Sequence, residues 1–307
     1  MQILSLQGIS KSYGKNRVLD RIDLDVHKGE IFVLLGSNGC GKSTLLRIMA
    51  TLLKPDSGEA LLFGSKGNQE KLKNVGIMFD HTAHWDKLTG YENAWIFARS
   101  YGLSNDMASS RLDSLFKWIG LSERRNEAVA AYSYGMRRKL SLIEALVHEP
   151  DLLLMDEPSM GLDYTSRLAI YSHLKQLADK GMAIILSTND VSEAELLASR
   201  VALLKKGHII ALDRPEHLVA SLNALTRIEM KLAVPISIES IRRIKGIEKV
   251  EASGNELRIL AASNHNSLSS VVKEVSTLGG IIQKIEVKEP NLGDAFLKFA
   301  GEEISAA

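Results

Sequence analysis

Eight residues, Gly36 to Ser43, have the types and spacing of a phosphate-binding loop. They read GSNGCGKS and match the pattern G-x-x-x-x-G-K-[ST], between a buried strand expected at Ile31–Leu35 and a helix expected over Lys42–Leu53. Successive backbone N–H groups of such a loop cradle phosphate oxygens, with help from the helix N-terminus. Lys42 is expected to reach the β- and γ-phosphates, and Ser43 to offer its hydroxyl to Mg²⁺. The predicted nucleotide-binding residues here are Gly36, Ser37, Asn38, Gly39, Cys40, Gly41, Lys42, Ser43 and Thr44.

A second candidate group ends another apolar run, Leu152–Met155, which is followed by Asp156 and Glu157. A carboxylate at the end of a buried strand suits a Mg²⁺ ligand, which is the role predicted for Asp156. Glu157 points the other way along the strand and is expected to polarise the water that attacks the γ-phosphate. Alone, an apolar run that ends in Asp-Glu is usually a solvated strand end, so the prediction depends on the phosphate loop.

Cys40 is the single cysteine of the chain and occupies a variable position of the loop. The simplest interpretation is a small side chain that fills space. The positive end of the following helix could also lower the pKa of its thiol. One cysteine excludes an internal disulfide framework and is typical of a reducing compartment.

With these two groups in place, residues 1–220 resemble the ATP-binding cassette (ABC) ATPases, and the segment Tyr132–Met136 resembles the family's signature motif. The resemblance implies that Ser133 and Gly135 of one subunit close on the γ-phosphate held by another subunit. Tyr134 replaces the usual first glycine. The following Arg137, Arg138 and Lys139 are interpreted as a solvated helix face.

The same resemblance assigns roles to further positions. Tyr13 is where the family stacks an aromatic ring on adenine, and residues 159–163 resemble the loop that crosses the dimer interface. Two positions depart from the family: Asp80 replaces a glutamine that senses Mg²⁺ and the attacking water, and Asn189 replaces the switch histidine. Asp80 can still ligate Mg²⁺, and neighbouring His81 offers an imidazole. Asn189 can donate a hydrogen bond but cannot transfer a proton near neutral pH. We therefore expect Glu157, Asn189 and Asp80 to form the catalytic group, with slow hydrolysis.

The pattern of strands and helices predicts two domains. Residues 1–221 alternate strands and helices, which indicates an α/β P-loop NTPase cassette with a mixed sheet and a helical subdomain over about residues 88–150. A capping box is expected at Thr89–Glu92. Residues 222–307 follow the order βαββαβ, with helices expected near Ile236–Ile244 and Ser267–Leu278, which is typical of a small ferredoxin-like α+β domain with a regulatory or docking role.

Composition limits the partners. The 307 residues are 45% hydrophobic and 24% charged, and 38 Lys and Arg against 37 Asp and Glu leave a formal charge of +1. This balance gives no basic footprint for nucleic acid, and no apolar run approaches the ~18 residues of a membrane span. No signal peptide is evident.

The resemblance implies that the chain binds and hydrolyses Mg-ATP in a head-to-tail dimer, homo- or heteromeric, and drives transport through a separate membrane permease from the cytoplasmic face of the cell membrane. The segment Glu289–Leu297 resembles the end of exporter-type cassettes and favours export. The region Asp80–Asn93, with His84 and Trp85, is expected to receive the permease. Two alternatives stay open: a weakly hydrolysing regulatory subunit that pairs with another cassette, and a soluble cassette protein that acts on ribosomes or DNA.

Overall fold

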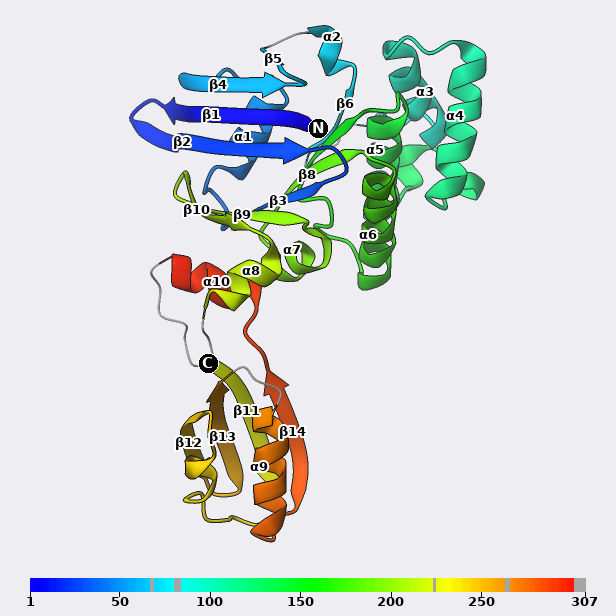
Figure 1. Ribbon diagram of the computed structural model, residues 1–307. Coiled ribbons are helices and arrows are strands. Elements are labelled where there is room, and N and C mark those ends of the chain that lie inside the picture. The colour runs from blue at the N-terminus through cyan, green and yellow to red at the C-terminus, as the bar shows by residue number, and fades with distance from the viewer. Residues whose placement is uncertain (67–68, 80–83, 223–224, 263–265, 301–307) are drawn as a thin grey trace. The chain divides into compact units, whose positions relative to one another are not determined.

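The computed structural model describes residues 1–66, 69–79, 84–222, 225–262 and 266–300. They form two compact units, Met1–Pro215 and Glu216–Ala307 (Figure 1). The sequence boundary expected at 221/222 lies six residues after this division. None of the helices in the described ranges has the length and apolar character needed to cross a membrane.

A six-stranded sheet positions the residues predicted to form the site. Its order is β10-β9-β3-β8-β7-β6, parallel except for the edge strand β10, as expected for a mixed sheet. Leu35 pairs with Thr188, and Asp156 pairs with Ser187, so β3, β7 and β8 end side by side. Buried parallel strands are apolar along their whole length, which is what these three strands show. The strands are β3 (Ile31–Leu35), β6 (Val75–Met78), β7 (Leu152–Asp156), β8 (Ala183–Thr188), β9 (Arg200–Lys205) and β10 (His208–Asp213).

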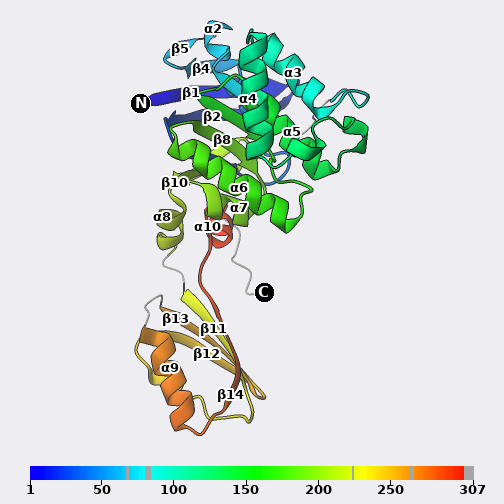
Figure 2. The same cartoon turned by 90° about the vertical axis from the view of Figure 1, so that its right-hand side faces the viewer.

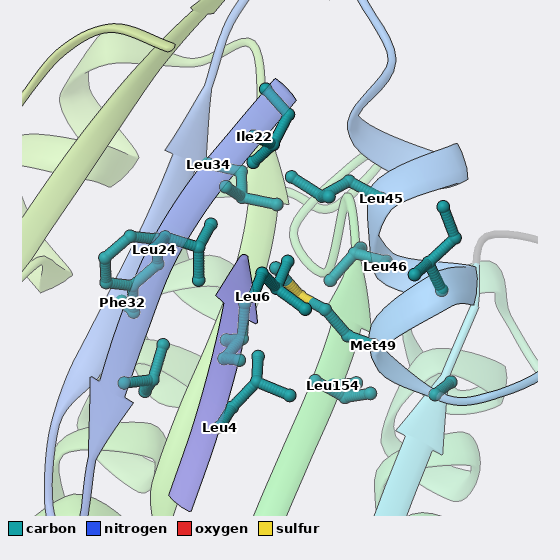
Figure 3. Packing of buried hydrophobic residues seen from close by; sticks show 14 of the residues in the cluster. Leu4, Leu6, Ile22, Leu24, Phe32, Leu34, Leu45, Leu46, Met49 and Leu154 are labelled. Atoms are coloured by element: carbon teal, nitrogen blue, oxygen red, sulfur yellow. The ribbon is translucent and has the colours of Figure 1, made fainter. Parts of the chain in front are cut away.

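A second, antiparallel sheet in the same unit has the order β2-β1-β4-β5, from β1 (Gln2–Tyr13), β2 (Asn16–His27), β4 (Ser57–Leu62) and β5 (Ser65–Lys66). Helix α1 (Lys42–Met49) packs against both sheets. Figure 3 shows Leu45, Leu46 and Met49 of α1 facing Leu4 and Leu6 of β1 and Leu154 of β7, all of them buried. The helix is shorter than expected because Thr51, with φ of 57°, leaves the right-handed helical region.

The remaining helices of the first unit lie outside the sheets (Figure 2). Helices α3 (Gly90–Ser100), α4 (Asn105–Trp118) and α5 (Tyr134–Leu146) contact one another, while α6 (Tyr164–Asp179) and α7 (Val191–Leu197) contact β8. The capping box predicted at Thr89 and Glu92 is present, with both reciprocal hydrogen bonds. Short segments complete this unit: α2 (Gln69–Leu72) and 3₁₀ turns at Ser122–Arg124 and Val129–Ala131.

The second unit contains a four-stranded antiparallel sheet in the order β12-β13-β11-β14. This is the strand order of a ferredoxin-like domain. The prediction of a helix near Ile236–Ile244 is wrong, because only a 3₁₀ turn, Ile241–Arg243, forms there. Ile236 and Ile238 alternate with polar residues after Pro235, so their spacing suits extended backbone, and both pack on the core of this unit. The elements are α8 (Pro215–Ala220), β11 (Leu225–Leu232), β12 (Ile247–Ser253), β13 (Glu256–Ala262), α9 (Asn266–Thr277), β14 (Ile282–Lys288) and α10 (Leu292–Phe299).

Just after α5, His148 makes the stability of the first unit sensitive to acid. Its Nε2 lies 3.2 Å from the Val75 carbonyl oxygen, its ring stacks on Tyr101, and its Nδ1 is buried without a hydrogen-bond partner among the described residues. Burial lowers the pKa of His148 from 6.5 to about 4. Between pH 6.5 and pH 4, His148 is therefore protonated in the unfolded chain but neutral in the folded chain. Because the unfolded state binds the additional proton, the free energy of unfolding decreases as the pH falls from 6.5 toward 4.

This predicts that His148→Gln, whose amide can still donate to Val75, flattens the loss of stability between pH 6.5 and pH 4. Urea unfolding of both proteins across this range measures the effect. Equal slopes for the two proteins would contradict the assignment.

Candidate functional site

The nucleotide loop leaves β3 at Gly36 and enters α1 at Gly41, and both positions require glycine. A Cβ on Gly36 would lie 2.4 Å from the Leu204 carbonyl oxygen, and Gly41 has φ of 113° with Leu19 and Val18 against it. Gly39 also has positive φ, at 78°. Gly41 is the N-cap of α1 and has no side chain to cap the first turn. The N–H groups in the first turn of α1 therefore have no side-chain cap and can bind an anion.

Lys42 connects this loop to the carboxylate that follows β7. It is 6% exposed, and its ammonium donates to the Gly36 carbonyl oxygen at 2.8 Å and lies 3.4 Å from Glu157 Oε1. Gly36 and Glu157 each follow the end of a parallel strand, so the aligned carboxyl ends of β3 and β7 explain the contact. Lys42, the predicted phosphate-binding residue, and Glu157, the predicted base, thus form an ion pair.

Glu157 has the environment of a proton acceptor. Burial raises the pKa of its carboxyl, and the Lys42 ammonium opposes this shift. Its backbone φ is 47°, an uncommon value for a non-glycine residue, and its N–H donates to the Ser187 carbonyl oxygen of β8 at 3.0 Å. A carboxyl whose pKa lies above its usual value is closer to the pKa that suits proton transfer near neutral pH.

Asp156 is 5% exposed at the end of β7, and its Oδ1 accepts a short hydrogen bond from the Ser187 hydroxyl. The sequence predicted no contact of Ser187 with this carboxylate, which Ser187 orients; the signal for it was the position of Ser187 near the end of the neighbouring strand. Ser43 and Thr44 lie half-buried on the first turn of α1. No cluster of three or more acidic, His or Cys groups of metal-ligand geometry occurs within the described ranges.

The prediction that Arg138 belongs to a solvated helix face is wrong. Its side chain is 1% exposed and donates to the carbonyl oxygens of Asp156 and Glu157 at the end of β7, and to that of Phe79 after β6. Arg137 is instead half-buried and pairs with Asp86. A guanidinium carries several N–H donors in a fixed plane and can satisfy several carbonyls at once. Arg138 therefore joins the helix that follows the signature segment to the strand end that carries Asp156 and Glu157.

Cys40 follows the simpler of its two interpretations. It is 5% exposed, and burial raises the pKa of its thiol, with Lys42 opposing the shift. The suggestion that the helix end lowers this pKa is wrong because desolvation outweighs the nearby positive charge. Cys40 thus fills space against Gly36, where its Sγ would meet an added Cβ at 2.7 Å.

The signature segment begins α5. Ser133 is the exposed N-cap, and its Oγ accepts from the Met136 N–H at 3.2 Å. Gly135 follows in the first turn, half-buried. Tyr134, the residue at the unusual position, is 45% exposed, and its ring lies over Gly161, where an added Cβ would approach to 2.9 Å. The tyrosine therefore packs on the loop expected to cross the dimer interface, and Gly161 leaves it room.

Asn189 comes directly after β8 and contacts the nucleotide loop. Its Nδ2 donates to Asn38 Oδ1 at 3.1 Å, and its side chain is exposed. Tyr13 ends β1 and is 49% exposed, with the Lys11 ammonium 6.0 Å from its ring centre. Asp80 and His81 lie outside the described residues.

The segment expected to receive a permease has one exposed and one buried member. Trp85 is 49% exposed, and Asn93, fully buried, fixes its backbone through hydrogen bonds of 2.9 Å to its N–H and 3.1 Å to its carbonyl oxygen. The His84 side chain is only 1% exposed and lies 3.3 Å from Glu144. His84 therefore supports this surface from beneath and is not itself displayed.

The fold and the site together define a P-loop nucleotide-binding protein. Comparison with known proteins narrows the class: residues 19–160 match the family model described as "ABC transporter". The linearmycin resistance ATP-binding protein LnrL of Bacillus subtilis is 32% identical over 97% of this chain and 98% of its own length. The Nod factor export ATP-binding protein I of Rhizobium etli is 32% identical over 99% of this chain and 95% of its own length.

A solved structure titled "Structure of ATP binding subunit of ABC transporter" is 27% identical, with a TM-score of 0.66, and covers 72% of this chain and 93% of its own. The chain belongs to the ABC transporter family. It is an ATP-binding subunit of the family, and its activity is ATP hydrolysis.

Proposed function

We propose that the chain is the ATP-hydrolysing subunit of an exporter, with the residues around Lys42 and Glu157 as its catalytic centre. The observation that carries the catalytic part of this proposal is the 3.4 Å contact between the Lys42 ammonium and Glu157. A triphosphate on the loop offers Lys42 a stronger anionic partner. Glu157 would then lose its cation and be free to accept a proton from the attacking water.

Mg²⁺ fits the donor set of this site. Asp156 is a buried carboxylate held by Ser187, and Ser43 offers a hydroxyl on the first turn of α1. One or two carboxylates together with substrate phosphates and water are the usual ligands of Mg²⁺. The ion would neutralise charge that develops on the phosphates, while the main-chain N–H groups from Gly36 to Gly41 and Lys42 hold the triphosphate. Thr44, Tyr13 and Asp80 stay predicted contacts of nucleotide or metal.

The second half of the proposed site comes from another cassette subunit. Ser133 is exposed at the N-terminus of α5, where the free N–H groups and the helix dipole favour an anion. Ser133 and Gly135 would close on the γ-phosphate of a nucleotide bound to the partner. Tyr134 supports this role by fixing the signature segment against Gly161.

The transport role rests on relatives and on one surface. The Rhizobium etli relative is named an export protein, and the alignment with it spans 99% of this chain. Trp85 is exposed on a backbone held by Asn93, and it is the kind of aromatic anchor that protein interfaces favour. Here it would bind a separate membrane permease that holds the chain at the cytoplasmic face of the membrane. Co-purification tests this: a multi-span membrane protein supports the proposal, whereas ribosomes or DNA contradict it, and a different cassette alone favours the regulatory alternative.

Slow hydrolysis follows from Asn189. Its amide reaches Asn38 but cannot take up a proton, so restoring an imidazole should accelerate turnover. We expect Asn189→His to raise the steady-state ATPase rate by about tenfold or more. Asn189→Ala, which removes the Asn38 contact without adding a proton carrier, is the matched control and should not exceed wild type. A rate for Asn189→His at or below that of wild type would sink this hypothesis.

A further inference from the structure

The sheet of the second unit has an edge strand, β14, with one side unpaired in the part of the chain that the structure describes. β14 pairs with β11 only (Figures 1 and 2). Every residue from Gln283 to Lys288 is exposed. An unprotected edge presents a row of free N–H and C=O groups to another chain. β14 is therefore a place where a further strand can add to the sheet.

The same edge displays apolar side chains. Ile285 and Val287 are 40% and 38% exposed, although they lie opposite Met230 and Ile228 of β11, which are buried in the core of this unit. Their face is thus the core face of the sheet, left uncovered at its margin. Ile281, 67% exposed, directly precedes the strand and adds a further exposed apolar side chain.

The charges of β14 do not match those of β11. Lys284 lies directly opposite Lys231, and Glu286 directly opposite Glu229, and like charges in these positions destabilise a pair of strands. The nearest compensation is local: Lys284 and Glu286 of the same strand are 3.3 Å apart, and Lys288 lies 3.4 Å from Glu229. Better partners for Lys284 and Glu286 would come from the free side of β14.

We propose that β14 pairs antiparallel with β14 of a second copy of this chain, about a two-fold axis through Ile285. This register places Lys284 opposite Glu286 of the partner subunit and Glu286 opposite the partner subunit's Lys284. It also brings Ile285 against the partner's Ile285. Both charges then gain an opposite charge across the strands, and the two sheets join into one. Such self-complementarity is what a symmetric homodimer interface requires.

The opposite edge of the sheet does not have these properties. In β12, Glu251 lies opposite Arg258 of β13, and the central Val250 is 4% exposed. Glu251 already lies opposite a positive charge within the sheet, and the centre of β12 is covered at Val250. The observations thus select β14 and a copy of the same chain.

This dimer goes beyond the proposed function because it needs no nucleotide. Two cassettes linked through β14 would remain neighbours after ATP is hydrolysed. Their nucleotide-dependent closure would then be an intramolecular step at a raised effective concentration. A failure of the β14 contact would leave the catalytic proposal untouched, and the converse also holds.

Thiol cross-linking of the full chain without nucleotide tests the register. In Ile285→Cys, two cysteines face each other at the axis, and a mild oxidant such as diamide should give a covalent dimer. In the control Gln283→Cys, the two cysteines lie four residues apart along the paired strands, about 13 Å, too far for a disulfide. Wild type, with buried Cys40 as its single cysteine, gives the background. Dimer from Gln283→Cys equal to that from Ile285→Cys, or none from either, overturns the proposal.

Charge exchange tests the same contact without oxidation. Lys284→Glu or Glu286→Lys alone should weaken nucleotide-free dimerisation roughly 2- to 30-fold, because each creates two like-charge pairs. A mixture of the two variants should form heterodimers in preference to homodimers, since the opposite charges then face each other again. Sedimentation and mass measurement of differently tagged chains report this. Unchanged dimerisation, no heterodimer preference, or an equal effect of the β12 control Lys249→Glu overturns the proposal.

Discussion

Glu157→Gln should lower the ATPase rate by about 10²- to 10⁴-fold while leaving Mg-ATP bound. Glutamine keeps the shape of the side chain and can still accept from Lys42 at the 3.4 Å site, but it cannot take a proton from water. Steady-state phosphate release measures the rate, and equilibrium dialysis measures binding. Undiminished turnover would show that another group positions the water.

A matched control and the pH profile sharpen this result. Glu149→Gln removes a carboxylate whose side chain is 71% exposed after α5, and it should leave the rate unchanged. Burial raises the pKa of Glu157, so the wild-type rate should fall as the pH is lowered through that raised pKa and the carboxylate is protonated. The residual rate of Glu157→Gln should lack this acidic limb. A variant that keeps the limb would assign it to a different group.

Lys42→Met should weaken the binding of Mg-ATP by roughly 10- to 150-fold, the value of one charge-assisted hydrogen bond to phosphate. The methionine fills the same buried space without the ammonium, so the loop should keep its conformation. Titration with a fluorescent ATP analogue measures the affinity. Lys66→Met removes a lysine whose side chain is 67% exposed and should bind as wild type does. An affinity of Lys42→Met for Mg-ATP within about twofold of wild type would contradict the phosphate-binding role assigned to Lys42.

Local pattern was enough to predict which elements carry most residues of the candidate site. The apolar strands, the glycines of the loop and the Asp-Glu pair each carry their signal within a few residues. Parallel pairing then brings Gly36, Glu157 and Asn189 together, because the strands before them end in register. The capping box at Thr89 is equally local and was predicted correctly.

Arg138 could not be predicted in this way. Three consecutive basic residues look like a solvated face, yet successive helical residues are about 100° apart, so three of them span about 200° of the helix. On a helix packed on several sides, one of the three has to face inward, and Arg138 does so because three backbone carbonyls lie there. Those carbonyls come from strands distant in sequence.

The separation of the first unit into two sheets was also invisible in the sequence. β1 and β2 alternate apolar and polar residues, whereas β3, β7 and β8 are buried throughout, but neither pattern says which strands pair. The choice of partner strand depends on α1 packing between the two sheets. The absent helix near Ile236 has a related cause. The isoleucines from Ile236 to Ile244 fit a helical spacing only in part. They pack against the core of the second unit as extended chain with a single 3₁₀ turn.

The most direct test of the account is whether a bound triphosphate brings Ser133 of a second copy onto the nucleotide. Sedimentation of Glu157→Gln with and without Mg-ATP, in the Lys284→Glu background that weakens the β14 contact, separates the two interfaces. We expect weakened association without nucleotide, a tighter dimer with Mg-ATP, and loss of that Mg-ATP-dependent dimer when Ser133→Arg is added. A nucleotide-saturated chain that stays monomeric, or a dimer indifferent to Ser133→Arg, would contradict the account.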